Sequence, residues 1–319
     1  MTANKLIRSA SDLVTPHDKT RAGFVAMALE KNNMATPYVE EARALKNLAS
    51  SADNPWELLE MEDIQIGLLA ASGLSEKAQN HLMPKEKSAA VREFIEKFLL
   101  PAGNDFADEL VYRYLLTKGD TLGGKARNLA GALGERKFLR SLISVFRIAG
   151  IESFCLEKEK KATEWNSLSI DSIGIENNIK AIYWQKKRPR ILILNAKIPI
   201  VGNSVDLIVC EGTKDSFLSG ENSILTQPER IIALGELKAG FDPAGADERW
   251  KTANSALNRI RKGFEKITRR PQLFFVGAAI EKAMAEEIFQ QLTTGMIQSV
   301  ANLTNEEQLT AICHWIINL

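Results

Sequence analysis

Histidine and cysteine are scarce in this chain of 319 residues, which has three of each. The cysteines are scattered with no C-x-x-C pair, and the histidines are isolated from one another. Because protein zinc sites use closely spaced ligands of these two types, the sequence predicts no zinc site. Cys210 ends an apolar run, so we expect it to be a small buried hydrophobic residue.

Long apolar runs are also missing. No uninterrupted apolar stretch approaches the roughly 20 residues needed to span a membrane, and residues 1–5 lack the apolar core of a signal peptide. No Walker A loop, Ser-His-Asp signature or cofactor motif stands out, which leaves a metabolic enzyme with little support. We therefore expect a cytoplasmic protein with no membrane partner.

The net charge is only +1, but the charge is unevenly distributed along the chain. Residues 186–190 form one basic cluster, in an expected turn between two strands. Residues 249–270 contain a single acidic residue, Glu265, and eight basic ones: Arg249, Lys251, Arg259, Arg261, Lys262, Lys266, Arg269 and Arg270. Such runs are usually solvated surfaces, yet two of them flanking a pair of carboxylates favour contact with a phosphate backbone.

The first half of the chain has a helical pattern. Thr15-Pro16 and Asn54-Pro55 are each typical of a helix start. Residues 89–100 carry an apolar stripe at helical spacing. We expect a helical domain over residues 1–120, and the pattern leaves open whether its role is structural or whether it encloses DNA.

A glycine-containing stretch follows, in which Gly119, Gly123 and Gly124 precede Lys125 and Arg127. A glycine turn leading into a helix N-terminus could hold a phosphate, with both basic side chains as DNA contacts. A plain connection between a loop and a helix fits the pattern equally well. The spacing does not match a Walker A loop, so nucleotide hydrolysis is not supported.

From about residue 180 the sequence pattern changes from helical spacing to short runs of β-forming residues. These runs cover residues 181–184, 191–194, 205–209, 231–237 and 273–276. Helical spacing recurs at residues 246–264, 281–292 and 305–317. The pattern predicts an α/β (α+β) domain over residues 121–319, with a mixed sheet flanked by helices.

Three charged residues interrupt the apolar runs. Asp206 lies within one run, and Glu236 and Lys238 end the next. Side chains at positions i and i+2 of a strand point to one face, so Glu236 and Lys238 project together. If Asp206 lies on a neighbouring strand, two carboxylates and one ammonium converge.

Hard oxygen ligands of this kind suit Mg²⁺, with the Leu237 backbone carbonyl as a further ligand. The metal would polarise a scissile phosphate and lower the pKa of a bound water. Lys238 would position or deprotonate that water and offset the charge of the transition state. The alternative is a buried ion pair or an exposed strand end, because an Asp followed about thirty residues later by Glu-x-Lys often occurs by chance.

The residues around and after Glu236 resemble those of a known protein family. GELK at residues 235–238, DPAGADE at 242–248 and WKTA at 250–253 closely resemble the AvaI/BsoBI family of type II restriction endonucleases. Residues 6–13 and 119–128 also look like that family. The similarity therefore extends over most of the chain.

The resemblance implies a homodimer that wraps around double-stranded DNA, with a PD-(D/E)xK catalytic domain and a helical domain that completes the enclosure. It implies recognition of C-Y-C-G-R-G (Y pyrimidine, R purine) and Mg²⁺-dependent cleavage of both strands after the first C. It also implies a host methyltransferase that acts on the same site but need not bind the enzyme.

By motif position, Asp206, Glu236 and Lys238 inherit catalytic roles. Asp242 would read a base, since a carboxylate can accept from a cytosine amino group in the major groove. Lys77 is matched to a lysine of the helical domain that contacts purine acceptors. The wider set of candidate DNA contacts is Asp242, Lys77, Lys125, Arg127, Lys251 and Arg259.

Arg249 departs from the family pattern, which has a histidine after Asp-Glu and before Trp. Arginine cannot act as a base at neutral pH, so Arg249 would clamp a phosphate at the catalytic site or lie on the helix surface as a bystander.

Two alternative functions remain besides that of a restriction enzyme. One is a DNA-binding protein of the same fold with impaired catalysis, and the other is a repair-type nuclease.

Overall fold

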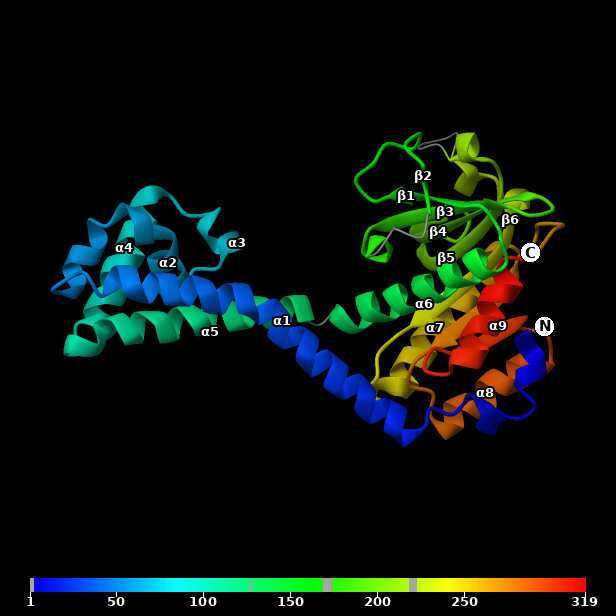
Figure 1. Cartoon of the computed structure of the whole chain (residues 1–319), viewed down its shortest axis with the longest axis horizontal. Helices are drawn as coiled ribbons and strands as arrows, with labels where there is room; N and C mark the ends of the chain where they lie inside the picture. Colours follow the sequence, from blue (N-terminus) through cyan, green and yellow to red (C-terminus); the bar gives the residue numbers. More distant parts are fainter. Residues whose placement is uncertain (1–2, 127, 169–173, 218–222) are drawn as a thin grey trace. The chain divides into compact units, whose positions relative to one another are not determined.

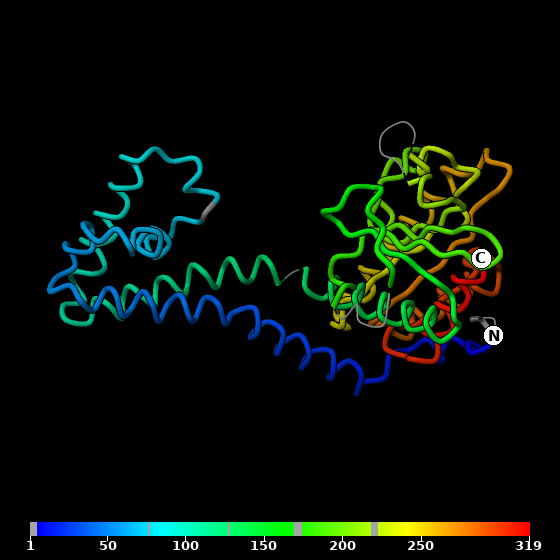
Figure 2. The backbone as a smooth tube through the Cα atoms, turned by 45° about the horizontal axis from the view of Figure 1, so that its top comes forward, coloured from blue at the N-terminus to red at the C-terminus, as the bar shows by residue number. Residues whose placement is uncertain are grey.

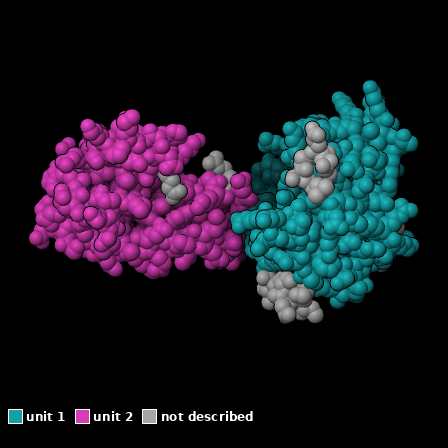
Figure 3. Space-filling view, turned by 90° about the horizontal axis from the view of Figure 1, so that it is seen from above, with its two compact units in different colours: residues 1–24, 130–319 teal, residues 25–129 magenta. Residues whose placement is uncertain are grey.

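The computed structural model describes residues 3–126, 128–168, 174–217 and 223–319. The chain forms two compact units, which are coloured separately in Figure 3. The sheet unit comprises residues 1–24 and 130–319, and the helical unit comprises residues 25–129. Within the described residues, no helix is long and apolar enough to cross a membrane.

This division differs from the expected one at residues 1–24, which the sequence assigned to the helical domain. Leu13 is fully buried and Ile7 nearly so, in the same apolar core as residues of the sheet. The Thr15 backbone N–H donates to the Ile280 carbonyl at 2.9 Å. In Figure 2 the blue N-terminal segment accordingly runs beside the orange and red C-terminal segments.

The sheet unit is built on a mixed sheet of eight strands in the order β2-β1-β3-β4-β5-β6-β7-β8. Pairing is antiparallel from β2 to β6 and parallel from β6 to β8. The strands are β1 (Ser153–Glu157), β2 (Asn166–Ser167), β3 (Ile179–Gln185), β4 (Pro189–Lys197), β5 (Ser204–Glu211), β6 (Ile231–Lys238), β7 (Gln272–Gly277) and β8 (Ser299–Asn302). The predicted α/β fold with a mixed sheet is confirmed.

Helices cover both faces of this sheet (Figure 1). They are α6 (Leu129–Ile148), α7 (Ala246–Gly263), α8 (Lys282–Thr293) and α9 (Glu306–Ile316). Buried residues of α6 and α9 share one core with Trp184 and Phe274, and buried residues of α7 and α8 share a second core with Ile191 and Phe275. Alternate strand residues enter the two cores, as expected for a sheet that is covered on both sides.

Short helical turns connect these elements. Those with 3₁₀ geometry are Ala3–Leu6, Ala10–Leu13, Ile175–Asn177, Lys214–Ser216, Ile224–Thr226, Pro228–Arg230 and Pro243–Gly245.

Strands β1, β2 and β8 were not predicted. Strand β8 has only four residues, and two of them, Ser299 and Asn302, are polar but buried, so the segment has no alternating pattern.

The helical unit has its own core around Leu58, Leu68 and Leu110. Its helices are α1 (His17–Ala49), which begins in the sheet unit, α2 (Gln65–Ala71), α3 (Glu76–Gln79), α4 (Pro84–Phe94) and α5 (Phe106–Ala126). Three 3₁₀ turns, Pro55–Leu59, Glu62–Ile64 and Gly103–Asp105, and a π-helical segment, Ile95–Leu99, complete it. Asn54 caps a 3₁₀ turn rather than an α-helix, and its side chain accepts from the Trp56 N–H at 3.0 Å.

The predicted glycine turn at residues 119–124 is wrong, because α5 continues through it to Ala126. Each internal glycine costs a helix only about 1 kcal/mol relative to alanine. Burial of Leu110, Val111 and Tyr114 along the same helix outweighs that cost. The chain turns later, where the Asn128 N–H donates to the Lys125 carbonyl.

Candidate active site

Strands β5 and β6 bring the three predicted catalytic side chains together. Their antiparallel register pairs Leu207 with Gly235, so Asp206 and Glu236 are the next residues along the two strands. Residues opposite each other on paired strands project to the same face. Lys238 is two residues beyond Glu236 and therefore projects to that face as well.

The contacts within this cluster are direct. Lys238 Nζ donates to Asp206 Oδ2 at 2.8 Å and to Glu236 Oε2 at 2.7 Å. The Leu237 backbone N–H also donates to Asp206 Oδ2, at 2.9 Å. The Asp206 carboxylate therefore takes the place of a ladder acceptor at the point where β5 and β6 separate.

Burial differs within the cluster. The Glu236 side chain is 4% exposed, that of Lys238 20% and that of Asp206 30%. Burial and the neighbouring Asp206 carboxylate raise the pKa of Glu236 to about 7, against the opposing effect of Lys238. Burial lowers the pKa of Lys238, but Glu236 and Asp206 outweigh it and the pKa shifts upward.

The donor set of this cluster fits a hard divalent cation. Burial and the Asp206 carboxylate leave Glu236 with a raised pKa, and a bound cation would lower that pKa by offsetting the repulsion between the two carboxylates. Among the described residues, no group of three or more His, Cys, Asp or Glu could hold a metal. A site with two carboxylates suits Mg²⁺, which keeps several water ligands and shares its shell with phosphate.

Asp242 and Arg249 lie just after β6 in the sequence. The Asp242 side chain caps the short turn Pro243–Gly245 by accepting from the Ala244 N–H at 3.0 Å. Arg249 Nη2 donates to the Asp242 backbone carbonyl. Burial lowers the pKa of the Arg249 guanidinium, and the Asp242 carboxylate opposes that effect.

Arg249 packs across the loop rather than lying free on the helix. A Cβ at Gly240 or Gly245 would lie within 3 Å of the Arg249 guanidinium group, so both glycines leave room for it. Arg249 therefore fixes the shape of the loop that presents Asp242. Arg249 is thus anchored to the loop, and its role at the catalytic site stays a prediction.

The other basic residues of α7 differ in their surroundings. Lys251 and Arg259 are exposed, and Lys251 Nζ pairs with Asp247 Oδ2 at 2.6 Å. Arg261 instead binds protein groups, with Nη2 3.0 Å from Gln291 Oε1 and 3.1 Å from the Met296 carbonyl. Only part of the basic run is therefore available to a ligand.

The second basic cluster, residues 186–190, does not flank the carboxylates. It lies in the β3–β4 turn, and Arg190 pairs in register with Glu211 at the far end of β5 from Asp206. Asp206 and Glu211 are five residues apart on one strand, which is about 17 Å at ~3.4 Å per residue. The expectation that both clusters flank the catalytic carboxylates is therefore wrong for this one.

The DNA contacts predicted in the helical unit lie on different elements. Lys77 is exposed on α3. Lys125 is in the last turn of α5, not at a helix N-terminus, and its Nζ donates to the Tyr38 hydroxyl at 2.9 Å. Arg127 lies outside the described residues.

A buried polar network near the catalytic residues was not predicted. Thr15 Oγ1 donates to the Ala278 carbonyl at 2.8 Å, and the Ala278 N–H donates to the Lys238 carbonyl at 2.9 Å. Asn302 Nδ2 donates to Thr15 Oγ1 at 2.8 Å and to the Leu13 carbonyl at 2.9 Å. The network thus ties the N-terminal segment to the strand ends beside Lys238.

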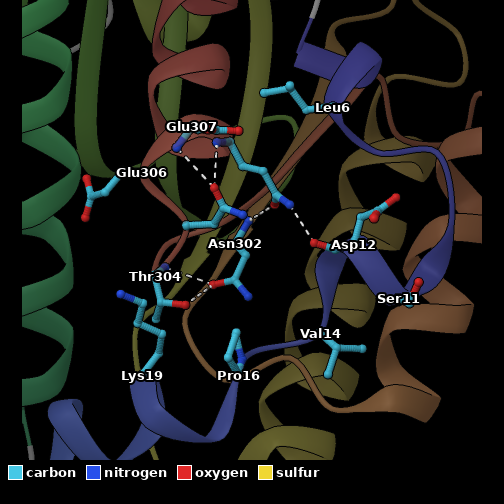
Figure 4. Close-up of a pocket in the computed structure, with 12 residues that line it drawn as sticks. Leu6, Ser11, Asp12, Val14, Pro16, Lys19, Asn302, Thr304, Glu306 and Glu307 are labelled. Carbon is cyan, nitrogen blue, oxygen red and sulfur yellow. Dashed lines mark hydrogen bonds between the residues drawn. The ribbon is translucent and has the colours of Figure 1, made fainter.

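Figure 4 shows the cavity, of about 580 Å³, next to this network. Thr304 donates from both its N–H and its hydroxyl to Asn302 Oδ1. Gln308 Nε2 donates to the Asp12 carbonyl at 2.6 Å. Thr15 and Asn302 are 287 positions apart, so no local pattern could have linked them.

Comparison with known proteins shows which family the chain resembles. The family model described as "Restriction endonuclease BsobI" matches residues 3–319. The type II restriction enzyme AvaI of Nostoc sp. is 48% identical over 314 residues, which is 98% of each chain. The type II restriction enzyme BsoBI of Geobacillus stearothermophilus is 47% identical over 315 residues, which is 98% of this chain and 97% of its own. The chain belongs to the BsobI restriction endonuclease family.

Proposed function

We propose that this protein is a Mg²⁺-dependent type II restriction endonuclease that cleaves both strands of duplex DNA at C-Y-C-G-R-G, after the first C. The observation that carries the proposal is the cluster of Asp206, Glu236 and Lys238 in a chain of this family. A cytoplasmic location fits an enzyme whose substrate is double-stranded DNA.

In the proposed mechanism, Asp206, Glu236 and the Leu237 backbone carbonyl would hold the cation. When bound, Mg²⁺ supplies Lewis-acid stabilisation of the scissile phosphate and a more acidic water. The Asp206 and Glu236 carboxylates offer hydrogen-bond acceptors that orient the attacking water. Lys238 Nζ, held between the two carboxylates, places a positive charge where negative charge develops on the phosphate.

Arg249 is already protonated at neutral pH and cannot accept a proton, so it cannot replace the histidine of the family pattern as a base. We assign it two linked roles: it fixes the Asp242 loop through the Asp242 carbonyl, and its cationic group is available to a DNA phosphate. Asp242 would read a cytosine amino group in the major groove. Lys77, Lys125, Arg127, Lys251 and Arg259 would contact DNA outside the catalytic cluster.

A palindromic site calls for two copies of the protein. Two-fold symmetric sequences are read by two-fold symmetric dimers, so we propose a homodimer with one catalytic cluster for each strand. We expected a helical domain over residues 1–120 and a catalytic domain over 121–319. We now propose that the helical unit helps to enclose the DNA and that the sheet unit carries the catalytic residues.

The test is digestion of supercoiled plasmid DNA followed by run-off sequencing of the ends. With Mg²⁺ we expect discrete fragments whose 5′ ends follow the first C of C-Y-C-G-R-G, and with EDTA we expect no fragments. Discrete cutting at another sequence would keep the reaction and reject the site. Random degradation would reject the restriction enzyme in favour of a repair-type nuclease.

The presence of arginine at position 249 favours one second candidate, a DNA-binding protein with impaired catalysis. Binding of a duplex that carries the site, with no cleavage in any divalent cation, would support it. In that case Glu236→Ala would change no measurable reaction, whereas in the enzyme it should abolish cleavage and leave DNA binding in place.

A further inference from the structure

The end of the sheet away from the catalytic cluster carries a group of cations that the proposed reaction does not use. We name it the distal basic cluster, and it consists of Lys186, Lys187, Arg188, Arg190 and Arg269. The first four come from the β3–β4 turn and the start of β4, and Arg269 from the connection between α7 and β7. They line a cavity of about 270 Å³.

The charges of this cluster are not balanced by the protein groups around it. Arg188, Arg190 and Arg269 each place a guanidinium nitrogen 3.5–3.7 Å from the Glu211 carboxylate. One carboxylate thus faces three guanidinium groups. Among the residues that line this cavity and its neighbour, six basic side chains stand against two acidic ones.

Only one of the three arginines is used to hold the fold. Arg190 is buried, and its guanidinium donates to the main-chain oxygen of Leu319 from Nε and Nη2, at 3.2 and 2.7 Å. The side chains of Arg188 and Arg269 are 64% and 50% exposed. Exposed ion pairs contribute only about 0–1 kcal/mol, so an anion can recruit these two arginines at little cost.

A second cavity, of about 520 Å³, opens beside the first and shares Arg269 with it. Its wall offers the hydroxyl groups of Thr213 and Ser216 together with Arg230. Glu211 Oε2, which is buried at this junction, accepts no hydrogen bond among the described residues. Guanidinium, ammonium and hydroxyl donors on one surface are the groups that bind phosphate oxygens.

We propose that the distal basic cluster binds backbone phosphates of DNA other than the phosphates held at the catalytic cluster. Asp206 and Glu211 are about 17 Å apart along β5 at ~3.4 Å per residue, so phosphates bound at the two ends of the strand are different ones. The ligand is a phosphodiester chain read without base contacts, so binding is independent of sequence and falls with salt. This second contact adds to the proposed cleavage reaction and does not depend on it.

Amine footprinting of the full-length protein tests the proposal. Lys186 and Lys187 are exposed, so an acylating reagent should modify both, and mass spectrometry reads each position. In EDTA, an excess of a short duplex without C-Y-C-G-R-G should slow modification of Lys187 at least fivefold. Lys161, which is exposed on the β1–β2 loop, is the matched control and should react at the same rate with and without DNA. Equal rates at Lys187 with and without DNA would overturn the proposal.

A second arm separates DNA from free phosphate. Inorganic phosphate at the same phosphate concentration should leave Lys187 unprotected, and protection equal to that by the duplex would reject DNA as the ligand. The double variant Arg188→Gln, Arg269→Gln should weaken the protection of Lys187 by the duplex. It should also reduce the slope of log K against log salt concentration, where K is the association constant for the duplex, by about two, one for each lost phosphate contact. Protection and salt dependence equal to those of the wild type would show that the two arginines form no such site. All arms omit metal, so their outcome is independent of the catalytic assignment.

Discussion

At the scale of the residue, Glu236 is a carboxyl group that the fold removes from water. Its side chain is 4% exposed, lies beside the Asp206 carboxylate and accepts a hydrogen bond from Lys238 at 2.7 Å. Its pKa near 7 places its protonation change close to neutral pH. Carboxyl groups whose pKa is shifted by burial and a neighbouring charge are found frequently at functional sites.

The pKa of Glu236 predicts a pH-dependent loss of stability in the metal-free protein. Between its ordinary value of 4.5 and about 7, the folded state binds a proton that the unfolded chain has released. The stabilisation from this group is therefore complete below about pH 4.5 and is lost as pH rises to 7. Urea unfolding in EDTA should show this decline, and Glu236→Gln should flatten it. Identical slopes for both proteins would contradict the prediction.

Lys238→Ala should separate catalysis from binding. It removes the ammonium between the two carboxylates, so we expect the cleavage rate to fall on the order of 10²- to 10³-fold. Binding of a duplex that carries the site, measured by fluorescence anisotropy in EDTA, should change little. Lys160→Ala, which breaks an exposed pair with Glu164, is the control and should leave both measurements as in the wild type. Equal losses of binding and cleavage would reject the catalytic role.

At the scale of the element, the geometry of the site depends on how closely β6 lies against β7. Gly235 precedes Glu236, and a Cβ there would lie 2.3 Å from Cε2 of Phe274. Phe274 is fully buried and packs edge-on against Trp315, with ring centroids 5.5 Å apart. The glycine is therefore required for packing, because the ring has little room to move.

Gly235→Ala should lower the free energy of unfolding by about 1–3 kcal/mol, since it overpacks a full core. Gly131→Ala is the matched control, because the added methyl group meets no atom within 4 Å on α6. That change should raise the free energy of unfolding by about 0.5–1 kcal/mol. Urea titration of both variants measures the difference. Equal effects would show that Phe274 can move aside.

At the scale of the whole molecule, the N-terminal segment belongs to the sheet unit although α1 continues into the helical unit. Leu13 is fully buried, and Asn302 binds its carbonyl. Thr15 then connects the segment to Ala278, beside the Lys238 backbone. The start of the chain is thus part of the scaffold of the catalytic strands.

Leu13→Ala should destabilise the sheet unit by about 2–5 kcal/mol through the cavity that it leaves. Hydrogen exchange followed by mass spectrometry should show faster exchange in β7, β8 and α8. Amides of α2 and the first part of α5, in the core of the helical unit, should keep their wild-type rates. Faster exchange confined to the helical unit would contradict this assignment of the segment.

Local patterns in the sequence determined much of this protein. The apolar runs that contain Asp206 and Glu236 predicted β5 and β6, and the i, i+2 spacing put Glu236 and Lys238 on one face. The motifs after Lys238 pointed to the family to which the chain belongs. These features depend on neighbours within a few residues, which the sequence displays directly.

Tertiary structure alone decided the rest. Strand register placed residues 186–190 at the far end of β5 from Asp206, and long-range hydrogen bonds joined Thr15 to Asn302. Packing also carried α5 through Gly119 and Gly123, against their intrinsic preference. Each of these outcomes depends on contacts between segments far apart in the chain. Such contacts leave no periodicity or spacing in the local sequence.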